Sequence, residues 1–214
     1  MNRDFEIRQL LRAYRSGIMS EAAFEEEMAR LEHEGAGSGQ PASPPFEVDG
    51  RVYRSEREAV LTFLDELHAT EMDSALGFAR WAAVCQIKGL RTGLLIAAER
   101  AAYHARVIQR HMHELGGDPH ASTTEEGHRM VEILGNNSVS DHENLSALTA
   151  AVQDPQQAVA PMLNFATALK RDVETQQALR LLADDELSTA TWLHEVNAAF
   201  VRQTPLPAND AKPQ

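Results

Sequence analysis

The sequence predicts an all-α protein, built as an antiparallel four-helix bundle with short crossover helices and a small helical hairpin at its N-terminal end. Apolar residues recur at helical spacing in every long segment, and no segment alternates apolar and polar residues for long enough to form a half-buried strand. Capping residues, Gly and Pro interrupt this pattern where helices are expected to begin and end. With 214 residues, of which 43% are hydrophobic, the chain can bury one substantial core and leave room for a small appendage.

The charge balance and the cysteine content restrict the classes of function. A formal net charge of -12 disfavours binding to nucleic acid or anionic membranes, because phosphate binding needs clustered Lys and Arg. The single Cys85 cannot form an intramolecular disulfide, which fits a reducing compartment. The N-terminus lacks the apolar core of a signal peptide, and an apolar run such as residues 94–98 is too short for a membrane span. We therefore expect a soluble, cytoplasmic protein that contacts neither nucleic acid nor membrane.

Residues 1–33 predict a helical hairpin. Apolar residues follow helical spacing on both sides of a break at residues 16–20, and Ser20 is a good N-cap for the second helix. The stretch Gly-Ile-Met-Ser-Glu-Ala-Ala-Phe-Glu, which begins at Gly17, resembles the short helical modules of the SHOCT type, in which such a signature joins two small helices. A hairpin of this size is too small to be stable alone, so we expect it to dock on the main domain or on another copy of itself.

The linker and the tail are defined by composition. Residues 34–50 are rich in Gly, Ser and Pro, a composition that packs no core and predicts a flexible linker. The bundle is expected over residues 51–203, and residues 204–214 are predicted to be a disordered tail.

The first two helices of the bundle should be antiparallel neighbours. Ser55 and Glu58 have the form of a capping box and open a long periodic segment through Ile87. Residues 88–93 contain two glycines and predict a short turn. The second helix then runs to Leu115, where a Gly-Gly pair ends it.

Two short helices should follow, because Ser122 and Ser140 are each followed three residues later by Glu, again in the form of a capping box. Asp154 and Pro155 then have the types preferred at the N-cap and first position of a helix, which opens the third helix of the bundle. After a loop at residues 171–174, the last helix is expected to run to about residue 202.

The end of the second helix carries a family resemblance. It reads Leu-Gly-Gly-Asp-Pro from Leu115 and follows His104 by about three turns. It resembles the second helix of ferritin-like, rubrerythrin-type four-helix bundles, whose members often end that helix in Leu-Gly-Gly-x-Pro after a Glu-x-x-His pair that binds two metals. Here Ala101 stands three residues before His104, so the Glu of the pair is missing.

The resemblance implies where ligands would lie. Ferritin-like dimetal sites take a Glu from each of two helices and a Glu-x-x-His pair from each of the other two. This chain fills three of the six places, with Glu71, His104 and Glu186 as candidate metal ligands. Thr189 stands where the second histidine belongs, and the third helix offers only apolar candidates near Val159. The metal identity stays open among iron, manganese and zinc.

These three residues leave two alternatives. They form either a reduced single-metal site or a buried network of ion pairs and hydrogen bonds, in which a Glu beside His104 raises the imidazole pKa. Glu99 does not complete the pair, because five residues place it about 140° around the helix from His104. In the acidic run at residues 184–186 only Glu186 is expected to point inward.

The remaining histidines predict no site. His111, His113 and His120, beside Glu114, are expected to be an incidental surface patch, because two residues separate the first two and place them on different sides of a helix.

Two functions remain as hypotheses. The first is a ferritin-like bundle with a degenerate metal site that serves as an oligomerisation or partner-binding module, with the N-terminal hairpin as connector. The alternative is a divergent iron- or manganese-dependent oxidoreductase of the rubrerythrin-like type that uses Glu71, His104 and Glu186. The resemblance would then imply peroxide or oxygen chemistry on iron.

Overall fold

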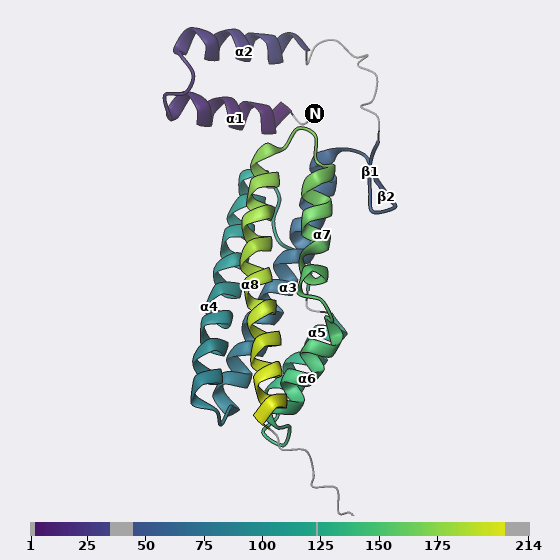
Figure 1. Cartoon of the computed structure of the whole chain (residues 1–214). Coiled ribbons are helices and arrows are strands. Elements are labelled where there is room, and N and C mark those ends of the chain that lie inside the picture. The colour runs from purple at the N-terminus through teal and green to yellow at the C-terminus, as the bar shows by residue number, and fades with distance from the viewer. Residues whose placement is uncertain (1–2, 35–44, 123, 204–214) are drawn as a thin grey trace, which may run out of the picture.

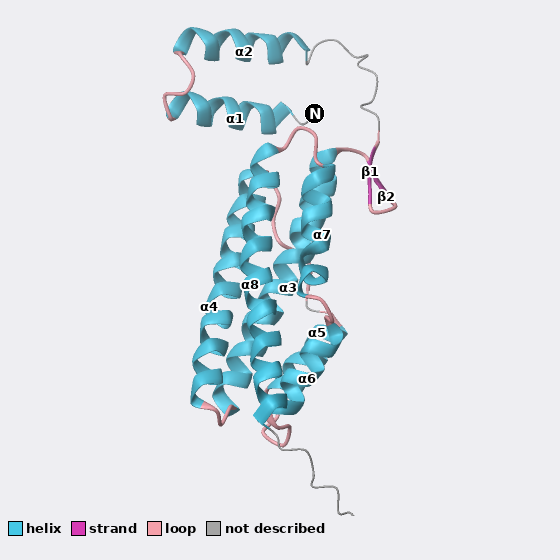
Figure 2. Cartoon of the chain, in the orientation of Figure 1, coloured by secondary structure: helices cyan, strands magenta, loops and turns pink. Residues whose placement is uncertain are grey.

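The computed structural model describes residues 3–34, 45–122 and 124–203, and these are mostly helical (Figures 1 and 2). The elements follow in the order α1 (Arg3–Arg15), α2 (Glu21–Glu34), β1 (Phe46–Val48), β2 (Arg51–Tyr53), α3 (Glu56–Val84), α4 (Lys88–Glu114), α5 (Glu125–Leu134), α6 (Asp141–Ala151), α7 (Pro155–Ala168) and α8 (Val173–Gln203). The predicted helical class is confirmed, with two short strands as an exception. The predicted disordered tail at 204–214 lies outside the described residues, as does most of the predicted linker.

The long helices α3 and α4 pack side by side along their length (Figure 1). Ser55 caps α3 by accepting from the backbone N–H of Glu58, whose carboxylate accepts from the N–H of Arg54 rather than that of Ser55. Only residues 85–87 connect the two helices, so the predicted turn at 88–93 is wrong and lies within α4. Within the described part of the chain, no helix has both the length and the apolar character of a membrane span.

Glycine allows α4 and α8 to approach closely. A Cβ atom placed on Gly93 would lie 2.0 Å from the ring of Trp192, so only glycine fits at this crossing. Gly93, one of the two glycines of the expected turn, therefore has a packing role instead.

The described residues form three long helices, α3, α4 and α8, rather than the predicted four, and the side that a fourth long helix would occupy is made of the shorter helices α5, α6 and α7. α7 has 14 residues and packs against the first half of α8. Along the second half of α8 the same side is formed by α5, which packs on α3, and by α6, which packs on α8 (Figure 1). The side chain of Asp154 accepts from Gln156 at the start of α7, and Pro155 lacks the N–H that would continue a helix from α6. These two residues therefore divide the fourth side into separate helices.

A two-stranded antiparallel sheet is the second difference. Phe46 pairs with Tyr53 and Val48 with Arg51, and both Phe46 and Val48 are buried in the core. The turn between them is Asp49-Gly50, where both residues have positive φ, the backbone that a two-residue hairpin turn requires. The expectations of no sheet and of a flexible linker as far as Gly50 are therefore wrong over these residues.

The described core consists of two apolar clusters. One lies towards the start of α3 and α8 and includes Leu64, Met112 and Phe165. The other lies near the α3–α4 turn and includes Trp81 and Leu94. Polar side chains occupy the level between them, and these form the candidate site.

Truncation should separate the N-terminal segment from the core. We expect deletion of residues 1–44 to leave a cooperative melt, because the ion pairs that Arg12 makes with the bundle lie at the surface and contribute little to stability. Deletion of residues 1–54 should lower the melting temperature by about 5 °C or more, because it also removes buried Phe46 and Val48. Thermal denaturation followed by circular dichroism checks both. Absence of a cooperative melt in the shorter deletion would show that α1 and α2 belong to the core.

Candidate metal centre

Three helices bring the predicted ligands together. Glu71 lies on α3, His104 on α4 and Glu186 on α8, and one ligand atom from each lies within 4.8 Å of the other two. His104 Nδ1 is 3.5 Å from Glu71 Oε1 and 3.4 Å from Glu186 Oε1. The structure therefore brings all three predicted residues to one point.

Burial makes this cluster unusual. His104 and Glu71 are 1% and 3% exposed, and Glu186 is partly buried. His104 Nδ1 and Glu71 Oε2 are buried without a hydrogen-bond partner. A buried polar atom without a partner costs about 1–3 kcal/mol, so such atoms are rare in folded proteins.

The electrostatics of the cluster favour a positive charge. Burial raises the pKa of Glu71 above its usual value, and the nearby Glu186 carboxylate raises it further, against the effect of His104. Burial alone would lower the pKa of His104, but contacts with Glu186, Glu71 and Asp185 outweigh it and raise that pKa to about 10. In the metal-free protein a proton on His104 thus supplies the charge that the carboxylates need.

Stability of the metal-free protein should depend on pH. The pKa of His104 is raised from 6.5 to about 10, so its contribution to stability is fully present below pH 6.5 and is lost as the pH rises through about 10. We expect the melting temperature of chelator-treated protein to fall between pH 7 and pH 10, and this fall to be smaller in His104→Gln. Differential scanning calorimetry checks the difference, and equal slopes in both proteins would contradict it.

Asp185 is a site residue that the sequence analysis missed. Its Oδ2 lies 3.2 Å from His104 Nε2, so the expectation that only Glu186 points inward from the acidic run is wrong. Asp185 and Glu186 both reach the imidazole of His104, because its ring points from α4 towards α8. Nε2 faces Asp185 and Nδ1 faces Glu186. A carboxylate on the distal ring nitrogen orients an imidazole that binds metal through the other.

Arg100 lies where ligands of a second metal ion would be expected. Arg100 donates to the hydroxyl of Thr189 and to the backbone carbonyl of Asp185. Its guanidinium therefore puts a positive charge beside Thr189, where the resemblance to ferritin-like bundles would place a second histidine. Val159 and Ala101 are buried apolar residues and offer no ligand. At this centre the described residues offer ligands for one metal ion.

The other candidates lie apart from this centre. Glu99 is exposed, as its angular position predicted. His113 pairs with Asp118 at 2.8 Å on the surface. The expectation of an incidental surface patch is wrong for His111, which is buried and hydrogen-bonded to Thr175, because it lies on the α4 face that packs towards α8.

A pocket of about 290 Å³ adjoins the centre. Its walls come from α3 and α7, with Phe63 and Met162 among the lining residues, and both Glu71 and Glu186 face it. A small molecule in this pocket would reach the carboxylates without opening the core.

The donor set fits a metal ion. One imidazole nitrogen and two carboxylates are ligands shared by zinc, iron and manganese. His104 Nδ1, which lies near two carboxylates but makes no hydrogen bond, and Glu71 Oε2 are atoms that a cation would satisfy.

Comparisons with known proteins add no relative. No protein-family model matches the chain, and searches of curated proteins and of solved structures returned no match. The class of this protein therefore follows from its fold and its site: a mostly helical protein with packed helix pairs and a buried Glu/His group that could hold a metal ion.

Proposed function

We propose that this chain is a ferritin-like helical bundle that binds one divalent metal ion through Glu71, His104 and Glu186. Support for the fold comes from the packed pairs α3 with α4 and α7 with α8, and from the ligands, which meet from α3, α4 and α8. Support for a single ion comes from Arg100, whose charge disfavours a second cation.

One observation carries the proposal. His104 Nδ1 and Glu71 Oε2 are buried and make no hydrogen bond, although the two side chains are close, with His104 Nδ1 3.5 Å from the other carboxylate oxygen, Glu71 Oε1. A network that served only to stabilise the fold would be expected to satisfy its members, because partly satisfied buried networks are costly. A bound cation would satisfy both atoms together.

Elemental analysis tests the proposal. Protein purified without chelator should contain iron, manganese or zinc, of which about one equivalent per chain depends on His104, and the same metal should rebind after removal by chelator. The expected metal affinity rises with pH, because the metal competes with the proton on His104. A chain that neither retains nor rebinds metal would leave the cluster as a polar network only.

A redox role is the more specific form of this proposal, and the pocket beside the carboxylates favours it. Iron or manganese held there would supply one-electron chemistry towards oxygen or peroxide. The protein's part would be to bind the ion, to hold His104 in place through Asp185 and to admit a small molecule between α3 and α7. Peroxide consumption by iron-loaded protein, compared with equal free iron, tests this role. Equal rates would leave metal binding without redox activity.

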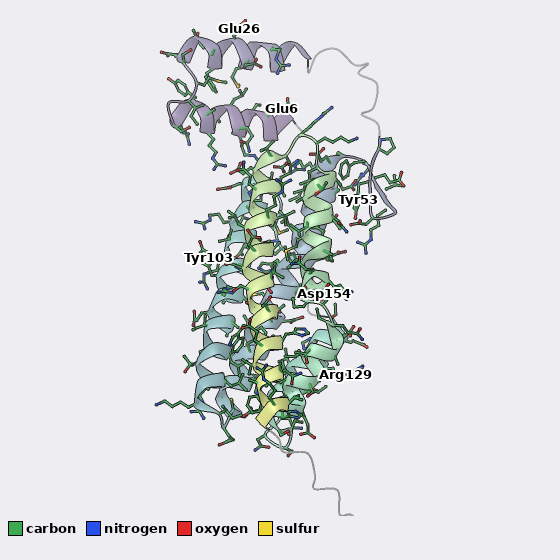
Figure 3. All side chains as sticks on the ribbon, viewed as in Figure 1. Glu6, Glu26, Tyr53, Tyr103, Arg129 and Asp154 are labelled. Atoms are coloured by element: carbon green, nitrogen blue, oxygen red, sulfur yellow. The ribbon has the colours of Figure 1, made fainter. Side chains whose placement is uncertain are left out.

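Assembly with a second copy is the other candidate function. The outer faces of α3 and α4 expose the large apolar residues Met72, Leu76, Leu95, Ile96 and Tyr103. Figure 3 shows Tyr103 on the outer side of α4. Exposed apolar side chains gathered on two neighbouring helices are typical of interaction surfaces.

The charges of α4 suit pairing with itself. Glu99 and Arg106 are both exposed and lie seven residues apart, so they share one face, and the Arg106 guanidinium lies 6.0 Å from the Tyr103 ring. In a two-fold pairing of antiparallel α4 helices, Glu99 would face Arg106 of the partner subunit. Light scattering should therefore give a dimer mass for the parent and a monomer mass for Tyr103→Glu. Leu181→Glu, a change at an even more exposed apolar residue on α8, is the control. A monomeric parent would refute this candidate.

A further inference from the structure

A second group of potential ligands lies at the end of α4. His111 and Glu114 are on its last turns, and Glu174 is at the start of α8. One ligand atom from each lies within 4.8 Å of the other two, and His111 Nδ1 is 3.6 Å from Glu114 Oε2. This group is two helical turns from His104 and shares no residue with the central site.

Hydrogen bonding fixes which nitrogen of His111 faces the carboxylates. The buried hydroxyl of Thr175 donates its only proton to Asp172 at 2.6 Å. Its oxygen is then left to accept from His111 Nε2, which lies 2.7 Å away. In the neutral imidazole the proton is therefore on Nε2, and the lone pair is on Nδ1, on the side of Glu114.

A lone pair beside a carboxylate repels it unless a proton or a metal cation lies between them. Metal-binding histidines are commonly oriented in this way, with the distal N–H held by an acceptor and the other nitrogen free for the metal. The Asp172–Thr175–His111 chain of hydrogen bonds is such an arrangement, and it is independent of the two Glu residues.

In this structure a side chain supplies positive charge to the group. Arg12 of α1 lies 3.5 Å from Glu114 Oε2 and 3.6 Å from Glu174 Oε1, so its guanidinium spans both carboxylates. α1 lies across the end of the long helices, where α8 begins (Figure 1). The same two carboxylates therefore hold α1 and complete the ligand group.

We propose that His111, Glu114 and Glu174 form a second divalent-cation site, suited to zinc, and that the cation and Arg12 compete for its carboxylates. One imidazole and two carboxylates are a ligand set that zinc accepts with a position left for water. Entry of the cation removes the charge attraction that holds Arg12, and the contact of α1 with the end of the bundle weakens. This inference does not depend on the central site.

Zinc stoichiometry tests the site. Full-length chelator-treated protein is titrated with zinc alone, and the equivalents bound are compared between the parent and Glu174→Gln. Glu174 is largely exposed, so its replacement leaves the core intact. We expect the variant to lose about one equivalent whatever the central site binds, because the two groups share no ligand. Equal stoichiometry in both proteins would overturn the proposal.

Two further variants test the architecture of the site. Thr175→Val removes the acceptor that orients His111 and should weaken the second zinc equivalent about 10- to 100-fold. Arg12→Gln removes the competing charge and should strengthen it about two- to tenfold, whereas Arg15→Gln, which removes a charge from the same turn of α1, should not. An equal effect of the two Arg variants would overturn the competition.

Hydrogen–deuterium exchange tests whether the contact of α1 weakens. Zinc should increase amide exchange over residues 6–15 in the parent, and Glu174→Gln should abolish that increase. Unchanged exchange over α1 in zinc-saturated parent would refute the coupling of cation binding to α1.

Discussion

His104→Ala is expected to reduce the metal bound at the centre from about one equivalent per chain to near zero. His104 supplies the only nitrogen ligand among the three candidates, and its Nδ1 is the atom that faces both Glu71 and Glu186. Without it, two carboxylates would have to hold the ion, one of which has a raised pKa and resists ionisation. Elemental analysis after equilibrium dialysis against the metal measures the loss.

Two controls on the same helix isolate the effect. His113→Ala removes an exposed histidine that pairs with Asp118, and Glu99→Ala removes an exposed carboxylate. Both variants should keep the full metal content. If His104→Ala and His113→Ala lose metal equally, the bound ion is not at the buried centre. If only a loss of stability follows in His104→Ala while the parent contains no metal, the cluster is a polar network.

Trp81→Ala is expected to destabilise the protein by about 3–5 kcal/mol, the cost of deleting a fully buried large aromatic side chain. Trp81 is 0% exposed and lies in the apolar cluster near the α3–α4 turn. Its indole N–H donates to Asp141 at 2.8 Å, and the other oxygen of Asp141 accepts from the N–H of Gln86. The hydrogen bond from Trp81 to Asp141 thus links the end of α3 to the start of α6.

Trp81→Phe separates packing from hydrogen bonding. It keeps most of the buried ring and removes the indole donor, so its cost should be near 1 kcal/mol. Urea denaturation followed by circular dichroism measures both variants. Equal destabilisation by the two substitutions would contradict the packing role, and a cost for Trp81→Ala below that for Trp81→Phe would place Trp81 outside the core.

The fold was predictable where periodicity and capping agree. The apolar stripe that begins after Ser55 predicted a helix through Ile87, three residues beyond the end of α3 at Val84, and Asp154 with Pro155 marked the start of α7. The same two residues implied that a helix could not run through them. The two short helices α5 and α6 were also predicted, but their packing on α3 and α8 was not, because periodicity within one segment does not show how neighbouring segments share a side of a bundle.

The β-hairpin was missed although a local signal was present. Asp49-Gly50 is a strong two-residue turn signal, but the Gly, Ser and Pro before Phe46 suggested that the linker continued past it. Three-residue strands are also too short to show alternation. The burial of Phe46 comes from tertiary packing, which no local pattern reveals.

The central site was predictable because its residues are polar exceptions on apolar stripes. Glu71, His104 and Glu186 each interrupt such a stripe, and antiparallel helices bring equal depths together. Asp185 and His111 were missed for the opposite reason: each stands beside other polar residues. Their burial and partners depend on the facing helix, which the sequence of one helix does not specify.

Anomalous X-ray diffraction from crystals of the metal-loaded protein tests the central claim most directly. Data collected at the absorption edge of the bound metal should show a peak about 2.0–2.2 Å from His104 Nδ1 and from carboxylate oxygens of Glu71 and Glu186. Bound metal whose anomalous peak lies elsewhere, with His104 still between the two carboxylates, would contradict the claim.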